Sequence, residues 1–334
     1  MTPRGRVRAA IVGAGLMGRW HARAVEHCGG VVAIVVDADP ARAGRLAAEH
    51  RARSARSLAE AAASSTGGGP AFDVVHICAP LATHAALARE AIDLGAHALV
   101  EKPLTATAAE TADLLRLADT RGVVLCPVHQ FPFQRGMRRA LAALPAIGPA
   151  LHIDAVACSA GADAGVDTAR DQVAADILPH PLSLFAALVD QPLAALSWTV
   201  QRPAHGELRA SALAGDTTLS LLVSMSGRPT VNSLRVIGAR GTAHADLFHG
   251  FAVVEEGSVS RARKITHPFA LAGATLGAAG ENLARRAMTR ESAYPGLREL
   301  VAAFHAAARG EAPPPISAAR TLDVARARDT VLGQ

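Results

Sequence analysis

Aromatic and cysteine residues are scarce in this chain. Of its 334 residues only 3% are Phe, Trp or Tyr, so few rings are available to stack on nucleic-acid bases, and the arginines are scattered. The four cysteines form no Cys-x-x-Cys pair, and Cys78 and Cys126 lie in apolar runs. We therefore expect no nucleic-acid partner, and we expect buried thiols in a reducing, cytoplasmic compartment.

Long apolar segments and signal-peptide features are also missing. No stretch of about 18 uncharged apolar residues is present, which predicts that nothing spans a membrane. The first residues are basic and lead directly into a strand-like run, without an apolar signal region or a cleavage site. With 50% hydrophobic and 19% charged residues, the chain can form a large core and two domains. We interpret the net charge of +5 as an aid to solubility rather than as the mark of an anionic partner.

Short apolar runs alternate with helical patterns through the first 128 residues. The strands that we expect cover residues 8–12, 31–36, 73–78, 97–100 and 123–127. The helices that we expect cover residues 17–28, 41–50, 57–63, 83–94 and 105–120. Regular alternation of strand and helix predicts a doubly wound parallel sheet, so we assign residues 1–128 to a nucleotide-binding Rossmann domain of α/β class.

The pattern changes in the remainder of the chain. The strands expected there are longer and separated by turns, at residues 151–158, 194–201, 207–214, 217–225, 230–238 and 241–246. One helix is expected among them, at 173–188, and three follow, at 280–288, 296–309 and 318–332. This succession predicts a second domain, residues 129–334, built on a mostly antiparallel sheet.

A glycine-rich turn follows the first expected strand and opens the first expected helix. Its sequence is Gly13-x-Gly15-x-x-Gly18, with Leu16 and Met17 inside the turn. Glycines allow the backbone to approach a pyrophosphate, and the free N–H groups of a helix N-terminus stabilise the phosphate charge. The arrangement predicts a dinucleotide site that includes these five residues.

An acidic residue ends the second expected strand, 19 residues after the last of these glycines. A carboxylate at Asp37 can accept hydrogen bonds from the adenosine ribose and would repel a 2′-phosphate, which favours NAD over NADP. The alternative is that Asp37 caps the next helix. Arg42 can reach the adenine or a 2′-phosphate, so NADP stays possible.

With these features, the chain resembles the Gfo/Idh/MocA family of oxidoreductases, the glucose–fructose oxidoreductase and inositol dehydrogenase type. The resemblance covers nearly the whole length and rests on five segments in the family's order: AIVGAGLMG from Ala10, CAPLATHA from Cys78, VEKPLT from Val100, Asp176-x-x-x-His180, and VIGARGTAHADLF from Val236. It implies a second domain with a large open sheet, a C-terminal helix that packs back on the Rossmann domain, and assembly into homodimers or homotetramers.

The resemblance implies a catalytic lysine. In this family the lysine of the Glu-Lys-Pro segment lies near the nicotinamide, so Lys102 should hydrogen-bond the reacting oxygen of the substrate. Its position at the carboxyl end of a buried strand agrees with that role, since ligands of such sheets bind at this edge. Glu101 is expected to position Lys102 or to contact the nicotinamide ribose. The sequence leaves open whether a cis peptide bond precedes Pro103.

Asp176 and His180 are four residues apart in one expected helix, which would put them on the same face. By the resemblance, His180 is the general acid/base and Asp176 binds a substrate hydroxyl. Two alternatives are that His180 is an ordinary core residue and that the pair binds a metal ion. We expect no metal site, because no third ligand is evident.

Several further residues occupy ligand-facing positions of the family. Those expected along the cofactor are Ala79, Pro80, Thr83, His84 and Gln130, and His129 is expected to face the substrate. His84 could instead cap a helix.

Three departures from the family pattern fall on the substrate side. Pro132 stands where an arginine is common, Arg170-Asp171-Gln172 replace a glycine triplet, and Ser183 replaces an acid. They argue against a simple free sugar as the substrate.

The segment from Gly257 to Arg298 has seven Lys or Arg against two acids around an apolar stretch. We interpret it as a solvated helix face or a subunit contact. A flap over the substrate and a basic face for a phosphorylated or lipid-like substrate are the alternatives.

Together these features predict an NAD(P)-dependent oxidoreductase acting on a secondary alcohol or ketone of a sugar-like, cyclitol or specialised-metabolite substrate. One alternative is an enzyme whose tightly bound NAD oxidises the substrate transiently, in an epimerisation or elimination. The other is a dinucleotide-sensing regulator without turnover.

Overall fold

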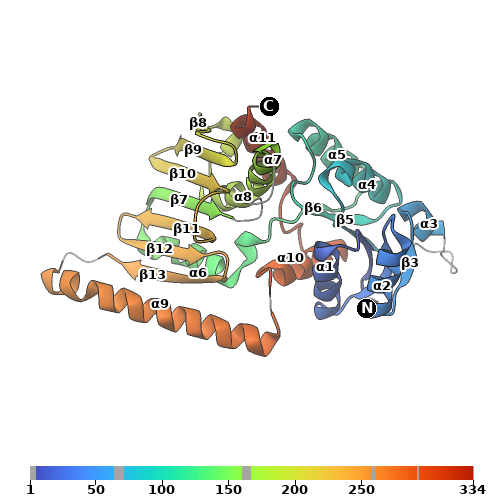
Figure 1. The fold of residues 1–334 in the computed structure, drawn as a ribbon, viewed down its shortest axis with the longest axis horizontal. Coiled ribbons are helices and arrows are strands. Elements are labelled where there is room, and N and C mark those ends of the chain that lie inside the picture. Colours follow the sequence, from blue (N-terminus) through green and yellow to red (C-terminus); the bar gives the residue numbers. More distant parts are fainter. Residues whose placement is uncertain (1–4, 64–70, 160–166, 258–259, 292, 334) are drawn as a thin grey trace. The chain divides into compact units, whose positions relative to one another are not determined.

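The computed structural model describes residues 5–63, 71–159, 167–257, 260–291 and 293–333 (Figure 1). The chain divides into two compact units. Unit 1 comprises residues 1–129 and 297–325, and unit 2 comprises residues 130–296 and 326–334. Each unit is built on its own sheet.

Unit 1 contains a six-stranded sheet in the order β3-β2-β1-β4-β5-β6, and every pair of neighbouring strands is parallel. The strands are β1 (Arg8–Val12), β2 (Val31–Val36), β3 (Arg53–Ala55), β4 (Val74–Ile77), β5 (His97–Val100) and β6 (Leu125–Pro127). The connecting helices are α1 (Leu16–His27), α2 (Pro40–His50), α3 (Leu58–Ala63), α4 (Leu81–Asp93) and α5 (Ala108–Thr120). The central strand β4 is buried along its whole length, as expected for a parallel sheet covered by helices on both faces.

Unit 2 contains a seven-stranded sheet in the order β13-β12-β11-β7-β10-β9-β8. Its strands are β7 (Ala150–Cys158), β8 (Thr199–Gln201), β9 (Glu207–Ala214), β10 (Thr217–Ser224), β11 (Val231–Gly238), β12 (Gly241–Asp246) and β13 (Phe251–Glu256). Only β7 and β10 pair in parallel, and the other pairs are antiparallel. Alternate residues of β9 are buried, so one face of this strand packs on the core while the other is exposed.

Two predicted helices differ in extent from those of the structure. The expected helix 173–188 is two helices, α7 (Asp167–Ile177) and α8 (Pro179–Leu188), because Pro179 lacks the N–H that would continue the first. Asp176 and His180 therefore lie on successive helices. The expected helix 280–288 is the end of α9 (Arg261–Thr289), which passes through Pro268.

Other elements were not predicted. They are β3, β13, α6 (Arg135–Ile147) and the short 3-10 helices η1 (Phe131–Phe133) and η2 (Leu193–Ala195). The remaining helices, α10 (Leu297–Ala308) and α11 (Ala318–Leu332), match the predicted C-terminal pair. In unit 1, α10 packs against α1, so the chain returns to the unit that holds the six-stranded sheet near its end.

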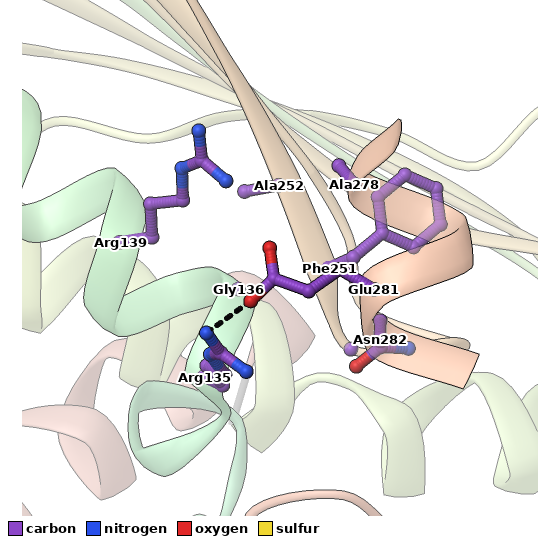
Figure 2. A pocket seen from close by; sticks show the side chains of 9 residues that line it. Arg135, Gly136, Arg139, Phe251, Ala252, Ala278, Glu281 and Asn282 are labelled. Carbon is purple, nitrogen blue, oxygen red and sulfur yellow. Dashed lines mark hydrogen bonds and ion pairs between the residues drawn. The ribbon is translucent and has the colours of Figure 1, made fainter. Parts of the chain in front are cut away.

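Polar side chains of helix α9 bond to other elements of unit 2. Figure 2 shows Glu281 paired with Arg135 of α6 beside a small pocket that Asn282 also lines. Asn282 Nδ2 and Arg286 Nη1 each donate to the carbonyl oxygen of His249, at 3.0 and 2.9 Å. Large apolar side chains of this helix are exposed instead. No helix among the described residues is long and apolar enough to cross a bilayer.

Candidate active site

The glycine-rich turn has the geometry that a bound pyrophosphate needs. Gly13 has a φ of +96°, and a Cβ there would lie 2.5 Å from the Cys78 carbonyl oxygen. A Cβ on Gly18 would lie 1.9 Å from the Gly13 carbonyl oxygen, so both positions require glycine. A Cβ on Gly15 would meet nothing within 4 Å. Gly15 is the N-cap of α1 and no side chain caps this helix, so the first N–H groups of α1 are available to an anion.

Asp37 connects the end of β2 to this turn. Its Oδ2 accepts the Ala14 N–H at 2.8 Å, and its Oδ1 accepts the Asp39 N–H at 2.9 Å and lies 3.1 Å from Arg42 Nη2. Burial alone would raise the pKa of Asp37, but these N–H donors and the Arg42 charge outweigh it and hold the pKa below its ordinary value. Asp39, and not Asp37, caps α2 through the N–H groups of Ala41 and Arg42. A charged carboxylate therefore lies beside the turn, with a guanidinium bonded to it.

Glu101 and Lys102 follow β5 at the same edge of the sheet. Glu101 is 8% exposed, and its Oε2 accepts the Lys102 N–H at 3.1 Å. Its Oε1 lies 3.2 Å from Nε2 of the buried His21. The peptide bond between Lys102 and Pro103 is cis, which answers the question that the sequence left open. Glu101 therefore holds the main chain of Lys102.

His84 is buried and bridges two loops of this edge. Its Nε2 lies 2.8 Å from the Ala79 carbonyl oxygen, after β4, and its Nδ1 lies 2.8 Å from the Pro103 carbonyl oxygen, after β5. Thr83 donates its hydroxyl to the Pro80 carbonyl oxygen at 2.8 Å, within the first turn of α4. His84 thus connects the loop at Ala79 to the loop at Pro103. The Thr83 hydroxyl bonds only within the first turn of α4.

The chain passes from unit 1 to unit 2 between His129 and Gln130. His129 is 4% exposed, and burial lowers its pKa to about 4, with smaller opposing effects of Glu101 and Lys102. Gln130 is 5% exposed, and its buried Oε1 has no hydrogen-bond partner among the described residues. An unsatisfied buried acceptor is costly, so the Gln130 side chain is suited to receive a donor from a ligand.

In unit 2, His180 stacks on Phe131. Their ring centroids are 4.2 Å apart with an interplanar angle of 15°, and His180 is 9% exposed. The Ser183 hydroxyl donates to the His180 carbonyl oxygen at 2.7 Å. Asp176 is half-buried, and its Oδ1 accepts from Gln172 Nε2 at 2.9 Å.

The residues that depart from the family pattern anchor α7. Asp171 accepts the Gly206 N–H at 2.7 Å and pairs with His205 Nδ1 at 2.6 Å, and Arg170 donates to the Ser226 hydroxyl. A cavity of about 530 Å³ lies beside this helix, and Gln172 is among the residues that line it. Gln172 connects this cavity to the predicted substrate-binding acid, because its Nε2 donates to Asp176 Oδ1.

Unit 1 brings its predicted cofactor residues to one edge of its sheet. The glycine turn follows β1, Asp37 follows β2, Ala79 and Pro80 follow β4, Lys102 follows β5, and His129 lies two residues beyond β6. In a parallel sheet these carboxyl ends lie together. Asp176 and His180 belong to unit 2. No group of three or more His, Cys, Asp or Glu suited to a metal ion occurs among the described residues.

Sequence reasoning missed the histidines that lie behind Glu101, which are His21, His76 and His305. The sequence did contain one signal, because His76 interrupts the otherwise apolar β4 (Val-Val-His-Ile).

Residues 7–129 match the family model described as "Oxidoreductase family, NAD-binding Rossmann fold", GFO_IDH_MocA. Over 126 residues the chain is 34% identical to UDP-N-acetylglucosamine 3-dehydrogenase of Acidithiobacillus ferrooxidans, and the aligned segment covers 37% of each protein. Over 118 residues it is 35% identical to the NADP-dependent scyllo-inositol 2-dehydrogenase IolU of Bacillus subtilis, covering 35% of this chain and 34% of that protein. The chain therefore aligns with little more than a third of the length of these curated relatives.

The whole chain is similar in fold to solved structures. Levoglucosan dehydrogenase, in complex with NADH and levoglucosan, superposes with a TM-score of 0.77 at 18% identity, over 98% of this chain and 97% of the other. The fold likeness extends through both units, while the sequence likeness lies in the nucleotide-binding unit. The family match therefore lies in residues 7–129, which are similar to the NAD-binding domain of Gfo/Idh/MocA oxidoreductases.

Proposed function

We propose that the protein is an NAD(P)-dependent oxidoreductase that transfers a hydride between nicotinamide and a secondary alcohol or ketone. The substrate class that we favour is a sugar-like, cyclitol or specialised-metabolite molecule. Residues 1–128 would hold the cofactor, and residues 129–334 would supply the substrate side and contacts between subunits.

The observation that carries this proposal is the meeting of the glycine turn, Asp37 and Lys102 at one edge of one sheet. A turn with free helix N–H groups suits a pyrophosphate, and a carboxylate one strand away suits a ribose. Lys102 lies on the far side of β1 from Asp37, across β4 and β5, where the nicotinamide half of an extended dinucleotide would reach.

Within this proposal the residues of unit 1 hold the cofactor. Gly13, Gly15 and Gly18 with Leu16 and Met17 bind the pyrophosphate, and Asp37 accepts from the ribose and favours NAD. Arg42 bonds to Asp37 Oδ1 and lies half-exposed beside it, so it is the residue that would admit NADP. Ala79, Pro80 and Gln130 would contact the nicotinamide half. We assign Thr83 and His84 to shaping that loop.

Bound NAD supplies the hydride acceptor, and the protein must handle the alcohol proton. In our assignment Lys102 donates a hydrogen bond to the reacting oxygen and His180 takes the proton as general base. Asp176, with Gln172 on its Oδ1, holds a neighbouring hydroxyl, and the buried His129 contributes an imidazole that is neutral near pH 7.

The test is turnover of a substrate panel followed by a single substitution. Purified protein is incubated with NAD or NADP and with free sugars, cyclitols and nucleotide-linked sugars, and absorbance of the reduced cofactor is followed. Lys102→Ala should reduce kcat by about a hundredfold or more on any active substrate, while the NADH dissociation constant changes little. Full activity of that variant would refute the assignment of Lys102.

The same experiment separates the two alternatives. Cofactor that stays bound through dialysis and is released only on denaturation would indicate transient oxidation. Saturable NADH binding with no turnover of the panel, and with unchanged binding in His180→Ala, would favour a dinucleotide sensor.

We propose in addition that the protein is a cytoplasmic homodimer or homotetramer. The support is α9, on which Ile265, Phe269, Leu276 and Leu283 are 71–80% exposed. At 100° per residue these four positions fall within about 40° of one another, and the last three are seven residues apart, as in a helix-pairing seam.

Light scattering coupled to size exclusion tests this assembly. The pair Phe269→Ser and Leu276→Ser should lower the molecular mass, whereas Met288→Ser, which changes an equally exposed residue (78%) outside the stripe, should not. A monomeric wild-type protein would refute the proposal.

A further inference from the structure

Three buried histidines form a hydrogen-bonded chain that ends on Glu101. His21 lies in α1, His76 in β4 and His305 in α10, all in unit 1, and their exposed fractions are 0%, 0% and 1%. Nε2 of His21 lies 3.2 Å from Glu101 Oε1, the Nδ1 atoms of His21 and His76 are 2.9 Å apart, and the Nε2 atoms of His76 and His305 are 3.3 Å apart. Nothing in the proposed function uses them.

The carboxylate sets the direction of every bond in this chain. A carboxylate only accepts, so the proton of neutral His21 must be on Nε2, which leaves its Nδ1 as an acceptor. His76 must then donate from Nδ1 and accept at Nε2, and His305 must donate from Nε2. All three rings can then be neutral imidazoles, and each donor points toward Glu101.

The far end of the chain supports this direction. His305 Nδ1 is buried without a hydrogen-bond partner among the described residues. In the direction set by Glu101 this atom is a bare acceptor. In the opposite direction, which an imidazolium at His21 would impose, it would be a buried N–H without an acceptor, and orphaned buried N–H groups are rare.

The surroundings oppose a positive charge on His76 and His305. Burial, followed by the neighbouring His21 and His305, holds the pKa of His76 well below its ordinary value. Burial lowers the pKa of His305 to about 4, with a smaller effect of Arg309. Phe304 packs edge-on against the ring of His76, with centroids 5.9 Å apart. Both effects favour the neutral form of His76 and His305 near pH 7.

We propose that His21, His76 and His305 are positioning residues that fix the orientation of the Glu101 carboxylate, and through Glu101 hold Lys102 at the cofactor edge of the sheet. Glu101 Oε1 receives the chain and Oε2 receives the Lys102 N–H. The chain thereby connects the helix after the glycine turn, the central strand and the returning helix α10 to the main chain of Lys102. The catalytic role of Lys102 rests on the proposed function, whereas the hydrogen-bonded chain of histidines does not.

The direction of the bonds also limits what the chain does with protons. A proton arriving at Glu101 cannot pass to His21, because Nε2 of His21 already carries one. At the other end His305 Nδ1 is buried, so solvent supplies none. The chain positions Glu101 and does not carry the alcohol proton of the reaction away.

Nitrogen NMR of the full chain labelled with ¹⁵N-histidine tests the direction near neutral pH. Long-range ¹H–¹⁵N correlations distinguish the two neutral tautomers from the imidazolium. The expected pattern is Nε2–H on His21, Nδ1–H on His76 and Nε2–H on His305. An imidazolium at any of the three, or the opposite set of tautomers, would overturn the proposal.

Glu101→Gln tests whether this residue sets the direction. The Lys102 N–H still needs an acceptor, so the new amide oxygen turns to it and the amide N–H₂ faces His21. All three tautomers should then reverse. Unchanged tautomers in this variant would show that Glu101 does not direct the chain.

The positioning role is tested at His305, at the far end from Lys102, with two variants of similar size. His305→Gln keeps a donor near the Nε2 position and His305→Phe removes it. Amide hydrogen exchange at Lys102 should be about tenfold faster in the Phe variant and close to wild type in the Gln variant. His27→Gln, at an exposed histidine of α1, is the control.

Kinetics separate this proposal from the proposed function. On a substrate found in the panel, His305→Phe should lower kcat by about fivefold with an NADH dissociation constant within twofold of wild type. Equal effects of the Phe and Gln variants on exchange and kcat would indicate a merely structural role. A wild-type protein that binds no NADH would refute the proposed function and leave the tautomer result standing.

Discussion

The two units differ in what fixes their functional residues. In unit 1 the carboxylates after β2 and β5 are held by backbone N–H groups that also lie just after strands. The Ala14 N–H donates to Asp37, and the Lys102 N–H donates to Glu101. In unit 2, α7 is held by contacts to distant loops, through Asp171 to Gly206 and Arg170 to Ser226. The proposed cofactor side is thus built from local signals of the sequence, and the proposed substrate side from long-range contacts.

The largest expected effect is the loss of NADH affinity in Gly18→Ala, in the glycine turn of unit 1. The added Cβ would lie 1.9 Å from the Gly13 carbonyl oxygen, so the glycine turn must move. We expect NADH affinity to fall by about a hundredfold or more, measured by fluorescence titration. Gly44→Ala, at a helical glycine with nothing within 4 Å of its Cβ, is the control and should bind NADH normally. Wild-type affinity in Gly18→Ala would contradict the geometry of the turn.

Acid should weaken unit 1 through its buried neutral histidines. His129 and His305 each have a folded pKa of about 4 against an ordinary value of 6.5. Between these values the unfolded chain binds more protons, so the free energy of unfolding decreases as pH falls from 6.5 toward 4. The loss is at most about 3 kcal/mol for each histidine.

Urea denaturation at pH 7 and pH 5 measures this effect separately in the two units. Trp20 lies in unit 1 and Trp198 in unit 2. The fluorescence of Trp198→Phe, which keeps Trp20, therefore reports on unit 1, and that of Trp20→Phe reports on unit 2. His305→Gln should reduce the pH dependence of the Trp20 signal. A Trp20 transition that does not depend on pH would contradict the buried neutral state.

The choice of cofactor should depend on the bonded pair Asp37 and Arg42. Asp37→Ser removes the charge that repels a 2′-phosphate and leaves Arg42 to attract it, so the ratio of NADPH to NADH affinity should rise by about tenfold. Arg42→Ala should change the ratio in the opposite direction. Parallel titrations give both numbers, and a ratio that neither variant alters would show that this pair does not select the cofactor.

The smallest expected effect is in unit 2. Asp171→Ala removes the acceptor of the Gly206 N–H and the partner of His205, both near the surface. The melting temperature reported by Trp198 should fall by about 2–4 °C without a change in NADH affinity. Asp216→Asn, at an exposed turn, is the control. Loss of NADH binding in Asp171→Ala would contradict the separation of roles between the units.

The nucleotide-binding sheet was predictable because its signals are local. Apolar runs of four to six residues, glycines at fixed spacing and an acid at the end of β2 identified β1, β2, β4 and β5. The strand β3 was not predicted, because Arg53-Ser54-Ala55 has only three residues and no apolar run. The predicted helix 105–120 begins too early, because α5 begins at Ala108 after Thr107, which forms the capping box with Glu110.

The candidate site was less predictable where distant segments meet. Spacing put Asp176 and His180 on one helix, but Pro179 divides it. No residue near Glu101 in the sequence predicts its contact with His21 or the chain through His76 and His305. These histidines come from three elements that are up to 305 − 21 = 284 residues apart along the sequence. Similarly, the sequence did not predict the polar contacts of α9, in which Asn282 bonds to His249 and Glu281 pairs with Arg135.

The most direct test of the account is a parallel titration of the purified protein with NADH and NADPH, followed by mass spectrometry of small molecules released on denaturation. The account predicts one saturable site per chain with tighter binding of NADH, and loss of that binding in Gly18→Ala. Saturable binding of neither dinucleotide would contradict the assignment of the glycine turn and Asp37 as a cofactor site, and with it the proposed oxidoreductase.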